Sequence, residues 1–72
     1  MTFRIEIEQE ADLRWLAEVS ELPGVACYGT TRADVLAKVQ ALALRVLADR
    51  AENGELVLEF LDVSFRMAPG AE

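Results

Sequence analysis

The chain opens with a regular alternation of apolar and polar side chains. Apolar residues occupy every second position from Phe3 to Ile7, and charged residues lie between them. A period of two places alternate side chains on opposite faces of an extended chain, so residues 2–8 are predicted to form a half-buried β-strand. Residues 13–19 alternate again and are predicted to pair antiparallel with the first strand, across a short polar connection at residues 9–12.

A turn and a third strand follow this second stretch. Pro23 cannot donate a backbone hydrogen bond, and Gly24 tolerates a positive φ. Leu22-Pro23-Gly24 is therefore predicted to end the second strand and reverse the chain, and residues 25–29 are predicted to form the third strand.

A long helix is predicted from about Arg32 to Asn53. Thr31 and Asp34 have the spacing of a capping box, with aspartate in place of the usual glutamate. Asn53-Gly54 supplies the left-handed residue that commonly ends a helix. Apolar residues between these ends recur three and four positions apart, which predicts one face packed on a sheet and one face in water. The apolar face consists of Val35, Leu36, Val39, Leu42, Ala43, Val46 and Leu47.

The last predicted strand spans residues 56–65 and carries apolar side chains on both parities. A central strand or a strand at a subunit interface would explain this doubling, and the pattern does not separate the two. Residues 67–72 show no periodicity and are predicted to form a disordered tail. Residues 1–66 are thus predicted to form one α+β domain of β-β-β-α-β order, in which an antiparallel three-stranded sheet and a fourth strand carry the long helix on one face.

Composition restricts the class of protein. A chain of 72 residues has room for one hydrophobic core, and its one cysteine, Cys27, excludes a disulfide within the chain. With no histidine, a zinc site would need carboxylates almost alone, so we expect no metal and no cofactor. No stretch has the character of a signal peptide or a membrane span, which predicts a cytoplasmic protein.

The charge balance bears on partners. Seven basic and thirteen acidic residues give a net charge of −6, which opposes attraction to nucleic acid and favours a basic partner. Small chains bury a small fraction of their surface and commonly need a supplement to the core. Self-association as a homodimer or a higher oligomer is the expected supplement here.

Three carboxylates are candidates for chemistry. Glu6 and Glu8 lie on the polar parity of the first strand, and Glu18 is predicted to lie near them across the ladder. Two-metal nucleases need such clusters to hold cations, whereas the ordinary role of such residues is a solvated strand face. With no histidine and with Arg4 beside them, contact with a partner protein is favoured over catalysis, and we expect neither enzyme activity nor catalytic residues.

The remaining distinctive side chains divide between the two faces. Leu16 and Tyr28 share the charged parity, which indicates a partly covered surface. Trp15 shares the other parity with Ala17 and is expected in the core. Cys27 is expected to be a buried and inert thiol.

The run Ala17-Glu-Val-Ser-Glu-Leu-Pro-Gly24, followed by Gly29-Thr30 and a helix, resembles the HicB-like antitoxin domain family. The resemblance covers roughly residues 3–53 and corresponds to a short form without the DNA-binding segment that many members carry. It implies a partial ribonuclease-H-like fold that neutralises a small basic toxin ribonuclease by covering its active site. Direct binding to nucleic acid is not expected.

Together, the pattern and the resemblance favour an antitoxin-like protein of a type II toxin-antitoxin system. Two alternatives stay open: an orphan scaffold or oligomerisation domain of the same fold, and a carboxylate-dependent nuclease. The residues expected to contact the partner are Glu6, Glu8, Leu16, Glu18, Leu22, Pro23, Gly24 and Tyr28.

Overall fold

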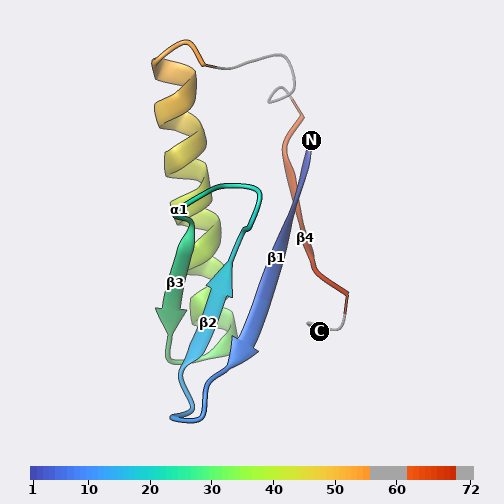
Figure 1. Ribbon diagram of the computed structural model, residues 1–72, viewed down its shortest axis with the longest axis vertical. Helices are drawn as coiled ribbons and strands as arrows, with labels where there is room; N and C mark the ends of the chain where they lie inside the picture. Colours follow the sequence, from blue (N-terminus) through green and yellow to red (C-terminus); the bar gives the residue numbers. More distant parts are fainter. Residues whose placement is uncertain (56–61, 70–72) are drawn as a thin grey trace.

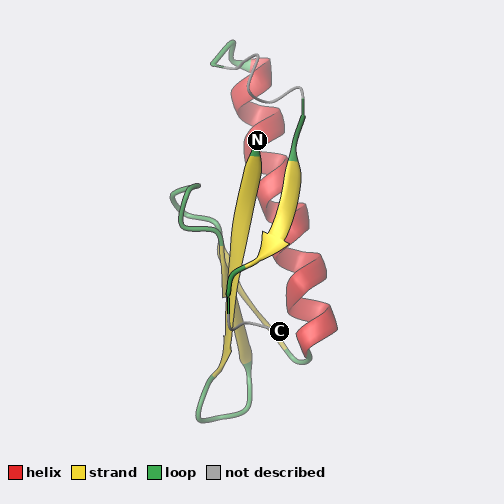
Figure 2. Cartoon of the chain, turned by 90° about the vertical axis from the view of Figure 1, so that its right-hand side faces the viewer, coloured by secondary structure: helices red, strands yellow, loops and turns green. Residues whose placement is uncertain are grey.

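A computed structural model describes residues 1–55 and 62–69 of the chain. Within these residues a four-stranded sheet carries one helix along one of its faces (Figures 1 and 2). The elements are β1 (Thr2–Gln9), β2 (Trp15–Glu18), β3 (Ala26–Gly29), α1 (Arg32–Glu52) and β4 (Ser64–Met67). The predicted α+β fold and its β-β-β-α-β order are confirmed. No helix of the described residues has the length and apolarity needed to cross a membrane.

The strands lie in the order β3-β2-β1-β4. β1 pairs antiparallel with β2, and β2 pairs antiparallel with β3, as predicted. β4 pairs parallel to β1, with Thr2 opposite Ser64 and Ile5 opposite Met67. Among the described residues β4 therefore lies at the edge of this sheet and pairs with β1 of the same chain. The first part of that predicted strand, residues 56–61, lies outside the described residues.

Several predicted boundaries need correction, and residues 62 and 63 of the last predicted strand lie before β4. β2 begins at Trp15 rather than at residue 13, because the Leu13 N–H donates to the Glu10 carbonyl oxygen (2.9 Å) and closes a turn. The last strand includes Met67, and the Ala68 N–H donates to the Ile5 carbonyl oxygen (2.9 Å). Met67, the first residue of the predicted tail, therefore belongs to β4, and residues 70–72 lie outside the described part.

The N-terminus of α1 is capped largely as predicted. Thr31 Oγ1 accepts the Asp34 N–H at 3.0 Å. Asp34 Oδ2 accepts the Thr30 N–H at 3.1 Å. In a capping box this carboxylate would accept the N–H of the N-cap residue itself, which is one residue later. The same carboxylate lies 3.1 Å from Lys38 Nζ, so it satisfies a backbone donor and an ion pair together.

The C-terminus of α1 ends in a Schellman motif. The Glu55 N–H donates to the Arg50 carbonyl oxygen (2.9 Å), and the Gly54 N–H donates to that of Ala51 (3.1 Å). Gly54 has φ +73°, which a residue with a side chain rarely adopts. The predicted end of the helix at Asn53-Gly54 is confirmed.

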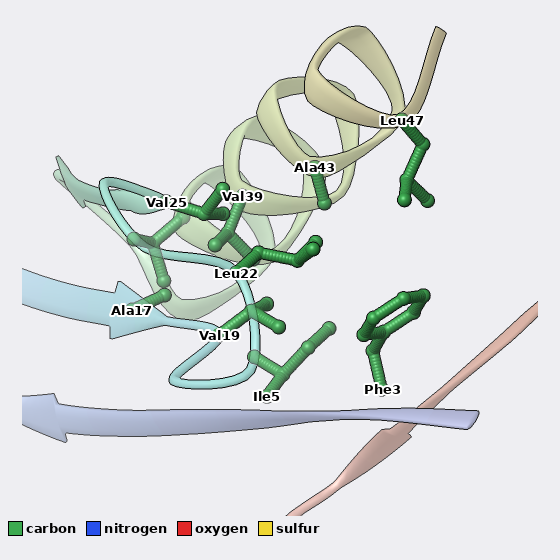
Figure 3. Packing of buried hydrophobic residues seen from close by; sticks show 10 residues of the cluster. Phe3, Ile5, Ala17, Val19, Leu22, Val25, Val39, Ala43 and Leu47 are labelled. Atoms are coloured by element: carbon green, nitrogen blue, oxygen red, sulfur yellow. The ribbon is translucent and has the colours of Figure 1, made fainter. Parts of the chain in front are cut away.

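The core lies between the sheet and α1 (Figure 3). Phe3 and Ile5 of β1 point toward the helix, which faces them with side chains four residues apart, from Val35 to Leu47. Burying one such side chain contributes about 1.5–3 kcal/mol. Trp15 packs against this core from a half-buried position, in agreement with its predicted role. The buried residues are Phe3, Ile5, Ala17, Val19, Leu22, Val25, Val35, Val39, Ala43 and Leu47.

Candidate protein-binding face

The sheet surface opposite α1 gathers five of the eight predicted contact residues. Side chains alternate across a strand, so the residues between the core positions of β1, β2 and β3 share this surface. In the register, Glu6 lies opposite Glu18, Glu8 opposite Leu16, and Leu16 opposite Tyr28. We call the surface formed by these five residues the outer face.

The acidic end of the outer face sets two carboxylates against each other. Glu6 and Glu18 are exposed cross-strand neighbours, and like charges in that position disfavour the pairing. Glu6 Oε1 accepts the Ser20 hydroxyl at 3.4 Å. Within residues 1–55 and 62–69, neither Glu6, Glu8 nor Glu18 forms an ion pair with lysine or arginine. Together with Ile7 and Leu16, these carboxylates line a hollow open to solvent.

The other end of the outer face sets Leu16 and Tyr28 beside Glu8. Leu16 is half-buried, and Tyr28 remains 44% exposed. The Tyr28 hydroxyl lies 3.5 Å from Glu10 Oε1, and the Arg14 guanidinium carbon lies 4.3 Å from the centre of the Tyr28 ring. These contacts hold the ring in place while part of it stays open to solvent.

The turn after β2 divides into a buried and an exposed part. Leu22 is only 2% exposed and lies beneath α1 beside Val19 (Figure 3), so its side chain belongs to the core and does not reach the surface. The turn itself is confirmed, since the Val25 N–H donates to the Leu22 carbonyl oxygen at 3.1 Å. Pro23 and Gly24 are exposed, and Gly24 has φ +86°. Of this tripeptide, only these two residues are available to a partner.

The turn stays close to the strand that carries Glu6. Glu21 Oε2 accepts the Arg4 N–H at 3.3 Å, on β1 just beyond the end of its pairing with β2. This contact places Pro23 and Gly24 in a loop anchored beside the acidic end of the outer face.

The hairpin between β1 and β2 adds residues that the sequence pattern missed. Arg14 Nε donates to Asp12 Oδ2 at 2.7 Å, and the Arg14 N–H donates to Asp12 Oδ1 at 3.2 Å. These hydrogen bonds from Arg14 lower the pKa of the Asp12 carboxyl. The available signal was the shared parity of Arg14, Leu16 and Glu18, which places Arg14 on the same side of the sheet as the outer face.

The described residues offer little for chemistry at this surface. Although Glu6, Glu8 and Glu18 share a face, no group of three or more cysteine, aspartate or glutamate side chains in the described parts is arranged to hold a metal ion. Cys27 is half-buried on the opposite face, with Sγ 4.0 Å from the Val35 carbonyl oxygen. Burial raises the pKa of its thiol, which keeps it protonated and weakly reactive. The outer face presents Leu16 and Tyr28 beside three carboxylates that form no ion pair among the described residues, and Arg14 lies against Tyr28. Comparison of the chain with protein family models, with curated proteins and with solved structures finds no match.

Proposed function

We propose that this chain is an antitoxin-like protein that binds a small basic mRNA-cleaving toxin and neutralises it. The observation that carries the proposal is the opposition of Glu6 and Glu18 on the outer face, without an ion-pair partner among the described residues. The resemblance of the Ala17–Gly24 run to the HicB-like antitoxin domain family supports the kind of partner.

Electrostatics explains why a basic partner suits this surface. A lysine or arginine placed between Glu6 and Glu18 would offset their mutual repulsion, and opposite potentials speed encounter and disfavour wrong partners. The chain as a whole has a net charge of −6, so the long-range field has the same sign as the outer face.

Leu16 and Tyr28 on the outer face suit the centre of an interface. Aromatic residues are enriched at the desolvated centre of protein interfaces, and a charged rim surrounds it. Tyr28 and Leu16 would supply the desolvated centre, and Glu6, Glu8 and Glu18 the acidic rim. Neutralisation then follows from covering the toxin's active site, in the cytoplasm where such a toxin meets mRNA.

The test uses a candidate toxin, namely a short basic protein encoded by a neighbouring open reading frame where one is found. We expect this protein to cleave RNA alone and to stop when the chain is added to saturation. Continued cleavage at saturation, or the lack of such a neighbour, would contradict the proposal and favour an orphan scaffold domain.

A charge-neutral variant locates the interaction. The double substitution Glu6→Gln and Glu18→Gln keeps side-chain size and is expected to raise the Kd at least about tenfold, a loss of about 1.4 kcal/mol. The matched control is Asp49→Asn with Glu52→Gln, which removes the same charge from exposed positions of α1. Equal weakening by both double variants would show a non-specific charge effect and refute the assignment to the outer face.

A further inference from the structure

The β1–β2 hairpin presents an apolar side chain to solvent. Leu13 is 70% exposed, the most exposed large apolar side chain of the described residues. The hairpin projects past the start of α1 in both views (Figures 1 and 2), so its tip stands clear of the rest of the molecule. The tip thus carries a protruding leucine that contributes nothing to the core.

Leu13 also occupies a backbone conformation that favours glycine. Its φ is +72°, and it is the one residue other than glycine with positive φ in the described part. It closes the turn that begins at Glu10, and the Glu10 N–H in return donates to the Arg14 carbonyl oxygen at 2.7 Å. Hairpins of this kind normally place glycine at the left-handed position after the turn.

A bulky residue that breaks a local rule without helping the fold points to another role. Glycine or asparagine would adopt this φ with less strain and would leave less apolar surface in water. The fold itself therefore does not account for the leucine side chain.

The surrounding contacts hold the tip in one conformation. Gln9 Nε2 donates to the Leu13 carbonyl oxygen at 3.1 Å, on one side of the leucine. On the other side, Arg14 is bound by Asp12 and stacks on Tyr28. A side chain presented by a preorganised loop loses little conformational entropy on binding. The stacking of Arg14 on Tyr28 also joins the tip to the outer face.

We propose that Leu13 is an apolar anchor that inserts into an apolar pocket with a basic rim on the partner protein. The tip carries one basic residue, Arg14, and three acidic ones, Glu8, Glu10 and Asp12, so its net charge is negative. A basic rim around the partner's pocket would complement that charge. This inference rests on the proposed function, because the partner is the same basic toxin. It extends the contact surface from the outer face to the end of the hairpin.

The experiment measures the Kd of the candidate basic toxin, inactivated by substitution of a catalytic residue, for four forms of the full chain. Leu13→Asn keeps a residue that tolerates positive φ and removes the apolar group; it is expected to raise the Kd about tenfold or more. Leu13→Met keeps an apolar side chain and is expected to stay within about threefold of the unmodified chain. The control Leu44→Gln changes another exposed leucine, 51% exposed on α1, and is expected to leave the Kd within about twofold.

Thermal unfolding of the variants without partner separates anchoring from folding. Leu13→Asn is expected to melt at the same temperature as the unmodified chain or higher, because strain is relieved. If it melts lower, Leu13→Gly takes its place in the binding measurement. A Kd unchanged by loss of the leucine side chain would overturn the anchor while leaving the proposed function intact. Failure of the unmodified chain to bind would overturn both.

Discussion

Gly29 shows how one missing side chain sets the distance between a strand and a helix. A Cβ on Gly29 would lie 2.8 Å from both the Cβ and the backbone nitrogen of Val35, closer than atoms pack. Gly29→Ala is therefore expected to push the start of α1 off the sheet and to cost about 1–3 kcal/mol. The melting temperature should fall by at least about 4 °C, measured by circular dichroism.

Gly24 offers a control in which space is not the constraint. A Cβ there meets nothing within 4 Å, but φ is +86°. Gly24→Ala should cost about 1–2 kcal/mol through backbone strain, and Gly24→Asn should recover part of the loss because asparagine tolerates this conformation. If Asn also rescued position 29, crowding against Val35 would be the wrong explanation there.

Residue roles were harder to predict than residue positions. The parity of Glu6, Glu18 and Tyr28 was enough to place them on one surface, because side-chain direction in a strand depends only on position along it. Leu22 lies in a turn, where no period applies, and its burial depends on the helix that covers it. For the same reason the exposure and left-handed backbone of Leu13 were not predictable.

At the scale of the element, the start of α1 should make the fold sensitive to acid. The ion pair with Lys38 and the hydrogen bond from Thr30 lower the pKa of the Asp34 carboxyl in the folded protein. Stability from this charge is present above the unfolded-state pKa of 3.8 and is lost as the pH falls through the lower folded-state value. Asp34→Asn keeps an oxygen for the Thr30 N–H but cannot ionise.

Urea unfolding at neutral pH and at roughly pH 3 would measure this effect. The unmodified chain is expected to lose more stability on acidification than Asp34→Asn does. Asp49→Asn, an exposed carboxylate of the same helix outside the N-terminal cap, controls for a general loss of charge. Parallel losses in the unmodified chain and Asp34→Asn would contradict a role for the cap.

The elements differed in how far the sequence could specify them. β1 and α1 carry their periods over long stretches, and α1 has capping residues at both ends, so both were predicted to within a residue. For β4 the sequence predicted neither the neighbouring strand nor the direction of pairing. Alternation decides which face a side chain takes but not which strand lies beside it. Its parallel pairing with β1 depends on the path of the chain after α1.

At the scale of the whole molecule, self-association stays a prediction. The described core contains ten buried residues, few for a domain that must be stable alone. We expect light scattering to give a mass at least twice the 8.0 kDa of the chain. A single 8.0 kDa species across the accessible concentration range would contradict this expectation.

The pairing of β1 with β4 limits how early the complete sheet can form. Thr2 lies opposite Ser64, and the rings of Phe3 and Phe65 stand 5.9 Å apart, although almost the whole chain separates them. Contacts between such distant residues form slowly, because a long loop must close before they contribute. During translation, β1 is made before residues 64–67, which cover its second edge. That edge of β1 therefore stays exposed until residues 64–67 have been made, and a chaperone or a neighbouring chain can bind there in the meantime.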